Sequence, residues 1–368
     1  MRLRSLDVLR GVTMAGMVVV NNPGDWATVY APLLHAEWHG WTPTDLIFPA
    51  FLFIAGAALV QGAPDRQRPW AIVRRGAVLV GLGLFLSGFP FFNPARWRIP
   101  GVLQRIGLCT TISALLWRAL AVPGQPLQTA RRLALVAAVC LLGHWALLAL
   151  VAPRGGLAGD LSAAGNLGAW LDRAVFGTHL WKTTWDPEGL LGSLPAVGTT
   201  LIGAVAGLWI ARARPHSAAL PLAGAGLTAV VVGLTWHAVL PINKSLWSSS
   251  YALFSGGVAL LALALVHQPL DDGRSSPWLD RLSEPFVALG RNALLLFVLS
   301  GVVGRVLNLL TIAHADGTTE TWQRAIYVTV FAPLAAPKLA SLLYAVTALG
   351  GLYALLAWLH RRRWYWSV

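Results

Sequence analysis

Long apolar runs follow one another along almost the whole of this 368-residue chain, and they limit its fold more than any other feature. A helix needs about 20 predominantly apolar residues to cross a bilayer. Because 56% of the residues are hydrophobic and only 12% are charged, the chain holds enough for about ten such helices. The runs lie at residues 8–20, 44–62, 76–92, 101–121, 133–152, 190–211, 219–240, 251–267, 285–303 and 338–359. We therefore predict an all-α, polytopic integral membrane protein with about ten transmembrane helices, forming a single transmembrane domain over residues 1–368.

Basic residues indicate how the chain is oriented. The net charge of +13 is spread along the chain rather than concentrated in one segment, which argues against a nucleic-acid-binding domain. Arginines instead gather between alternate apolar runs, where they usually mark the cytoplasmic side, and the clearest clusters are Arg74–Arg75, Arg131–Arg132 and Arg361–Arg363. Their positions predict that both termini are cytoplasmic. Because Asp7 and Arg10 interrupt the entry to the first run and no small-x-small cleavage site follows, we predict an uncleaved span rather than a secretory signal.

Several common kinds of site have no counterpart in the sequence. Cys109 and Cys140 lie inside apolar runs and are expected to be packing residues. There is no Cys-x-x-Cys pattern, so we predict no metal site. There is also no Gly-rich phosphate loop, nucleophile elbow or dinucleotide fingerprint. Polar residues next to or inside the apolar runs are therefore the candidates for function.

The loop between the first two runs carries the strongest candidates. Asp45 begins the second run among apolar neighbours, and a buried carboxylate is costly unless it is paired. A histidine is a natural partner, because the pair fixes the imidazole tautomer and raises its basicity. His35 and His39 compete for this role, and their spacing does not choose between them. The sequence 42–45 is equally typical of a helix N-cap, and the two roles of Asp45 are compatible.

Four further polar segments lie within or beside apolar runs. They are Arg105, the acidic pair Asp186 and Glu188, Asn243-Lys244 with Trp247, and Arg291-Asn292. An arginine inside a span needs a carboxylate, a phosphate or a water-filled cavity. Helix capping explains the acidic pair equally well, and a snorkelling side chain explains Lys244. The residues alone fit a transporter and a membrane-embedded transferase equally well.

Short motifs nevertheless occur in a recognisable order along nearly the whole chain. They are Leu6-Asp7-Val8-Leu9-Arg10-Gly11, Val20-Asn21, His35-Ala36-x-Trp38-x-Gly40, Asp45-Leu46-x-Phe48-Pro49, the segment from Arg98 to Arg105, Asp186-Pro187-Glu188-Gly189, Asn243-Lys244, Leu246-Trp247-Ser248 and Gly290-x-Asn292. Together they resemble the catalytic membrane domain of the heparan-α-glucosaminide N-acetyltransferase family. The resemblance extends to a bacterial inner-membrane branch of that family, which is associated with N-acetylglucosamine use.

The resemblance implies a reaction and its residues. In the family, acetyl-CoA is used from the cytosolic side and the acetyl group reaches a terminal glucosamine on the far side. The pattern makes His35, rather than His39, the catalytic histidine and Asn21 its partner; this chain has a few more residues between them, which leaves Asn22 as an alternative. The family also implies a homodimer. The lysosomal enzyme has an additional luminal domain with no counterpart before Met1, so we expect a free amino sugar or a short glycan as acceptor.

The chemistry of such a transfer fits the candidate residues. Neutral His35 accepts the amine proton near pH 7, Asp45 orients it, and Asn21 donates to the developing oxyanion, a contribution of about 3 kcal/mol. We expect the others to bind substrates: Asp186, Glu188, Asn243, Lys244 and Trp247 the amino sugar, and Arg74, Arg75, Arg105, Arg291 and Asn292 the acetyl donor, acetyl-CoA. Direct transfer in a ternary complex and transfer through acetyl-His35 both fit. The alternatives are an amino-sugar permease and O-acetylation of an envelope glycan.

Overall fold

The computed structural model describes residues 3–62, 68–213, 218–272, 276–313 and 317–366. These residues form α1 (Arg4–Asn21), α2 (Ile47–Leu59), α3 (Pro69–Gly88), α4 (Val102–Leu120), α5 (Pro126–Leu150), α6 (Leu167–Phe176), α7 (Ser193–Ala213), α8 (Ala219–Trp236), α9 (Ser249–Asp271), α10 (Pro277–Arg291), α11 (Ala293–Leu309), α12 (Trp322–Ile326) and α13 (Pro337–Arg361). Short 3-10 turns include η3 (Pro43–Leu46), and a π-helical turn, η6 (Tyr327–Phe331), follows α12. A small antiparallel hairpin joins β1 (Thr311–Ala313) to β2 (Thr319–Thr321).

The helices confirm the prediction of an α-helical membrane protein, and each of the ten predicted runs overlaps a helix. Among the described residues, six helices are long and apolar enough to cross a membrane: α3, α5, α7, α8, α9 and α13. The pair α10 and α11 would make a seventh if it forms one span. The remaining predicted spans fall on α1, α2 and α4, and α2 has only 13 residues. Ten spans therefore stay a prediction.

The ninth predicted run is not one straight helix. It is divided between α10 and α11, whose axes differ by 72°, and the break lies at Asn292. The Asn292 side chain donates to the carbonyl oxygen of Trp364 and accepts from the N–H of Trp366, at 3.1 and 2.9 Å. The C-terminal segment thus pairs both polar atoms of this buried side chain.

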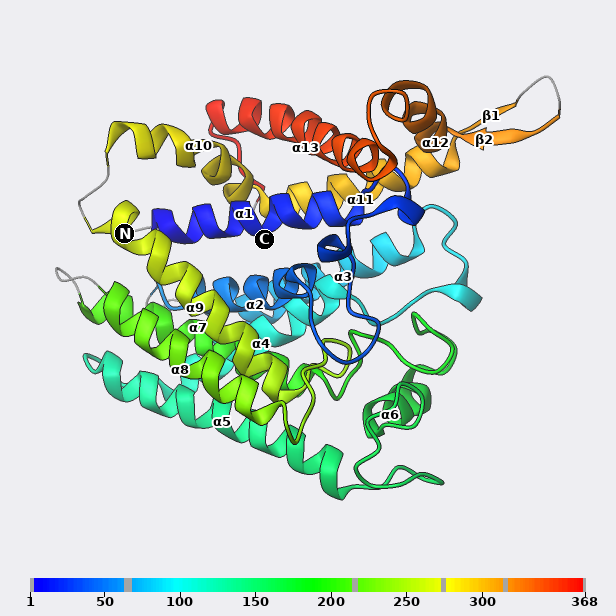
Figure 1. Cartoon of the computed structure of the whole chain (residues 1–368). Helices are drawn as coiled ribbons and strands as arrows, with labels where there is room; N and C mark the ends of the chain where they lie inside the picture. Colours follow the sequence, from blue (N-terminus) through cyan, green and yellow to red (C-terminus); the bar gives the residue numbers. More distant parts are fainter. Residues whose placement is uncertain (1–2, 63–67, 214–217, 273–275, 314–316, 367–368) are drawn as a thin grey trace.

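The helices pack in two groups around α1 and α2. Figure 1 shows α10, α11 and α13 on one side of α1, and α5, α7, α8 and α9 on the other. Glycine allows the closest approaches, because a Cβ on Gly203 of α7 would lie 1.9 Å from the backbone oxygen of Phe53 in α2. Glu284 of α10 contacts both Arg4 and His360, so the start of α1 and the end of α13 share one end of the assembly. The candidate site described next lies at the opposite end, which we call the His35 end.

Candidate active site

Asp45 lies at the centre of the site, where its carboxylate both caps a turn and contacts His35. It lies in η3, the turn that leads into α2, and its side chain is fully buried. One carboxylate oxygen, Oδ2, accepts the N–H groups of Thr42 and Ala36 at 3.0 and 3.1 Å, which completes a capping box. The other, Oδ1, lies 2.6 Å from Nδ1 of His35. The capping and the orienting roles of this residue are therefore compatible in one geometry.

The charge state of Asp45 follows from these contacts. Burial alone would raise the pKa of the Asp45 carboxyl, but the hydrogen bond with His35, the positive charge of Lys244 and the N–H of Ala36 together lower it to about 2. The carboxylate is thus ionised at neutral pH and accepts the Nδ1 proton of His35. This fixes the tautomer in which Nε2 carries the free lone pair. About half of the His35 side chain is exposed.

Lys244 brings a third group to the pair from the loop between α8 and α9. Its Nζ lies 3.0 and 3.3 Å from the two ring nitrogens of His35 and 3.5 Å from Oδ1 of Asp45. Burial lowers the pKa of Lys244 even though Asp45 opposes this shift. A cation placed here is suited to a negative charge that develops beside His35.

Asn243 and Trp247, which were predicted to bind the sugar, shape the loop that carries Lys244. Both are fully buried, and the Asn243 side chain accepts the N–H of Leu246 at 2.8 Å. Trp247 adopts a positive φ of 49°, and its indole N–H donates to Thr199 at 3.2 Å. These contacts hold Lys244 at the site through the loop.

Arg98 lies between the two predicted acidic residues. Its Nε and Nη2 donate to the two oxygens of Asp186 at 2.8 and 2.5 Å, and Nη2 also contacts Glu188. Asp186 accepts the N–H groups of Trp181 and Glu188 as well, so its carboxylate is fully engaged. Glu188 instead lines the cavity beside His35. The structure therefore leaves Glu188, more than Asp186, accessible to a bound sugar.

Arg105, predicted to contact acetyl-CoA, is buried behind the same acidic turn. It donates to the carbonyl oxygens of Pro187 and Gly189 at 3.0 and 2.6 Å, and its guanidinium lies 5.0 Å from the ring centre of Trp247. These contacts join α4 to the acidic turn and to the Lys244 loop. In this geometry Arg105 has a structural role, because it holds α4, the acidic turn and the Lys244 loop together.

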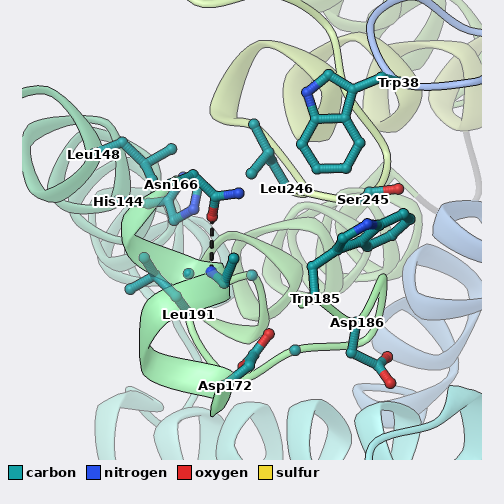
Figure 2. A pocket seen from close by; sticks show the side chains of 14 residues that line it. Trp38, His144, Leu148, Asn166, Asp172, Trp185, Asp186, Leu191, Ser245 and Leu246 are labelled. Carbon is teal, nitrogen blue, oxygen red and sulfur yellow. Dashed lines mark hydrogen bonds between the residues drawn. The ribbon is translucent and has the colours of Figure 1, made fainter. Parts of the chain in front are cut away.

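Two tryptophans close one side of the site. Trp38 and Trp185 pack edge to face with ring centres 5.0 Å apart, and Figure 2 shows both above Asp186. The pocket behind them measures about 20 Å³, which is room for one water. Both tryptophans also line the larger cavity that contains His35. They are flat apolar surfaces of the kind that sugars pack against.

Asp172, at the far edge of this small pocket in Figure 2, gives a pH-dependent prediction. Burial raises the pKa of its carboxyl to about 6, although the Leu190 N–H donates to it at 2.7 Å. A raised folded-state pKa favours the protonated form, so this group's contribution to stability is greatest below about pH 4 and is lost through pH 6. Asp172→Asn should therefore increase the free energy of unfolding above pH 6 by roughly 2–3 kcal/mol, with little change near pH 4. The melting temperature should rise accordingly above pH 6.

Thermal unfolding at pH 4.5 and pH 8 in one detergent tests this. Asp160→Asn is the matched control, because hydrogen bonding from Ser162 lowers the pKa of Asp160. An equal shift in melting temperature at both pH values for Asp172→Asn would contradict the prediction.

A cavity of about 570 Å³ extends from the site between the helices. His35, Asp45, Glu188 and Lys244 line one end of it, as does Asn21. From there it runs along α1 past apolar side chains that include Met14, Ala55, Leu79 and Leu294, and Arg10 lines its inner part. At 1.5 Å per residue, the 11 positions between Arg10 and Asn21 correspond to about 16 Å. The cavity is thus a long, mostly apolar passage that ends at His35.

The remaining predicted donor-binding residues do not line this cavity. Arg74 and Arg75 are exposed on α3. The Arg291 guanidinium lies 3.7 Å from the ring centre of Tyr365, and Asn292 binds the C-terminal segment as described above. Arg10 was missed as a possible ligand, although a charged residue inside an apolar run was a signal for it.

A family model described as "Heparan-alpha-glucosaminide N-acetyltransferase, catalytic" matches residues 2–164, which include Asn21, His35, Asp45 and Arg98. Heparan-alpha-glucosaminide N-acetyltransferase from Homo sapiens is 28% identical over 358 residues, covering 81% of this chain and 52% of the relative. The Mus musculus protein of the same name is 27% identical over 357 residues, covering 81% of this chain and 53% of the relative.

The chain is thus similar to the heparan-α-glucosaminide N-acetyltransferase family over most of its length. It spans about half the length of the curated relatives that it matches. The family model covers α1 to α5 and the loop after α5. Glu188 and Lys244 lie beyond the matched residues, and the three-dimensional structure is what brings them to His35.

Proposed function

We propose that this protein is a transmembrane N-acetyltransferase that moves the acetyl group of cytoplasmic acetyl-CoA to the amine of a glucosamine-type sugar on the periplasmic side of a bacterial inner membrane. The observation that carries the proposal is the His35–Asp45 pair, with 2.6 Å between its nitrogen and oxygen, at the end of a 570 Å³ passage. An apolar passage about 16 Å long along α1 suits the thin arm of a thioester donor that enters from the other side. Similarity to heparan-alpha-glucosaminide N-acetyltransferase supports the same reaction.

The reaction needs a base, because only a neutral amine attacks a thioester. The amine nitrogen attacks the thioester carbonyl carbon, and Nε2 of His35 takes the amine proton while Asp45 stabilises the imidazolium. The carbon–sulfur bond then breaks, and the proton on His35 passes to the departing thiolate. The products are an amide on the sugar and free CoA.

The surrounding groups have matching roles in this proposal. The amide of Asn21 and the ammonium of Lys244 stabilise the oxyanion, each donor contributing about 3 kcal/mol if well placed. Glu188 accepts from the sugar's hydroxyl groups or ammonium, with Asp186 behind it through Arg98. Arg10, with Arg74, Arg75 and Arg291 nearer the cytoplasmic face, is proposed for the phosphates of CoA. Ten spans, cytoplasmic termini and a homodimer remain parts of the proposal.

The direct test uses the purified chain in nanodiscs with acetyl-CoA and glucosamine. We expect thiol release that depends on glucosamine, and a product of the mass and amide chemistry of N-acetylglucosamine. An ester product would identify O-acetylation instead. Uptake of unmodified N-acetylglucosamine into proteoliposomes without thiol release would identify a permease and would overturn the proposal.

The same preparation separates the two mechanisms. With labelled acetyl-CoA and no acceptor, an acetyl-His35 intermediate would leave label on the peptide that contains His35. Direct transfer in a ternary complex leaves that peptide unlabelled. His35→Gln supplies the control for label carried elsewhere.

A further inference from the structure

A second, larger cavity of about 1260 Å³ opens beside the first. The two share Asn21, His35 and Arg98 among their lining residues, so a molecule bound in the second cavity reaches the catalytic histidine. Pockets for drug-sized ligands are about 300–1000 Å³. The second cavity is therefore larger than a free amino sugar requires.

This second cavity follows the helices deep into the apolar part of the molecule. Its walls come from the outer part of α3, from α4, from α11 and from α13, as far as Leu352. Leu352 lies 15 residues beyond Pro337, where α13 begins at the His35 end, which corresponds to about 22 Å along the helix. Because α3 and α13 are both long and apolar enough to span a membrane, this depth reaches the hydrocarbon region. A hydrocarbon chain fits such a space, and a soluble sugar does not need it.

Arg305 places a positive charge in this cavity. It lies about one turn before the end of α11, and its Nη1 donates to the carbonyl oxygen of Gly301 at 3.0 Å. Among the described residues, no carboxylate forms an ion pair with Arg305, whereas Arg98 is paired with two and Arg324 with Glu320. A cavity-lining arginine without a carboxylate partner is suited to an anion, and its planar guanidinium matches a phosphate.

We propose that the second cavity binds the acceptor as a lipid, in which an amino sugar is joined to a hydrocarbon chain through a phosphodiester. Arg305 contacts the phosphate, the chain lies along α11 and α13, and the sugar's amine reaches His35. This assignment rests on the proposed function, because it names the acceptor for the same acetyl transfer. The bonds made and broken are those given above, and the phosphodiester is unchanged.

Four synthetic acceptors test the assignment in nanodiscs: the methyl and decyl glycosides of glucosamine, and the methyl and decyl phosphodiesters of glucosamine 1-phosphate. Because burial of the chain's methylenes in the cavity favours binding, we expect kcat/KM for the decyl phosphodiester to exceed that for the methyl phosphodiester by about 100-fold or more. The methyl and decyl glycosides show how much of this gain the chain gives without a phosphate. The decyl phosphodiester should remain about tenfold better than the decyl glycoside.

Two pairs of variants then connect the preference to the cavity. Arg305→Gln should reduce the ratio of kcat/KM between the decyl phosphodiester and the decyl glycoside about tenfold, whereas Arg154→Gln, on an exposed loop, should not. Val303→Trp fills the cavity wall and should reduce the advantage of a decyl over a methyl chain. Val346→Trp, at an exposed position of α13 that does not line the cavity, is its control.

The outcomes separate this inference from the proposed function. Equal kcat/KM for the methyl and decyl phosphodiesters, or an unchanged phosphodiester preference in Arg305→Gln, would overturn the lipid acceptor while acetyl transfer to glucosamine still stands. No transfer to any acceptor would overturn the function itself. A native mass spectrum in which Val303→Trp converts a dimer to a monomer would show that a second copy of the chain occupies the cavity, which would also overturn the lipid assignment.

Discussion

Substituting alanine for His35 should lower kcat/KM for acetyl transfer by about 10³-fold, since a positioned general base typically contributes 10²- to 10⁴-fold. Asp45→Asn should have a loss of similar order, because an amide cannot both hold the Nδ1–H tautomer and stabilise the imidazolium. Thiol release from acetyl-CoA at saturating glucosamine measures both variants. Their melting temperatures show whether the fold survives.

His39→Ala is the matched control for this prediction. His39 belongs to the same loop, but it lies 3.3 Å from the Asn243 amide and does not line the 570 Å³ cavity. We expect its kcat/KM to stay within a few-fold of the unsubstituted protein. If His39→Ala lost as much activity as His35→Ala, or if His35→Ala kept full activity, the assignment of His35 as the base would be wrong.

Removing Arg98 should have the largest effect on stability. Arg98→Met leaves the buried Asp186 carboxylate and the neighbouring Glu188 carboxylate without their shared cation. Breaking a buried ion pair on one side typically costs about 3–5 kcal/mol, because the remaining charge stays desolvated. A clear fall in melting temperature, measured in one detergent at pH 7.5, is the expected result.

A charge-neutral combination tests the reason for that loss. Arg98→Met together with Asp186→Asn and Glu188→Gln removes all three charges and should recover much of the melting temperature, because no carboxylate is left uncompensated. Arg96→Met, at an exposed position two residues away, is the control. A single Arg98→Met variant as stable as Arg96→Met would contradict a structural role for this cluster.

Much of the helical framework could be predicted from local sequence. Each apolar run overlaps a helix because a backbone in lipid must satisfy its hydrogen bonds within the segment itself. The need of Asp45 for a partner was likewise visible locally, since a carboxylate at the start of an apolar run must be paired or capped. The choice of His35 over His39 came from resemblance to the family and not from spacing.

The contacts between distant segments could not be predicted in this way. The ninth run breaks at Asn292, whose side chain binds backbone groups of Trp364 and Trp366, more than 70 residues later in the chain. Arg105 was predicted to contact the donor, whereas the fold uses it to hold the acidic turn around Pro187. Spacing along the chain does not indicate which of several possible anions or carbonyls an arginine reaches.

The sequence by itself determined an α-helical membrane protein with a polar site at one end of its first two runs, because apolar length and the cost of isolated charge act locally. The tertiary structure alone decided which charges meet. Lys244 reaches His35 across 209 positions, and Arg98 reaches Asp186 across 88. It also decided that two cavities meet at His35. These features depend on how helices pack against one another, and that packing depends on the shapes of facing surfaces, which no local pattern encodes.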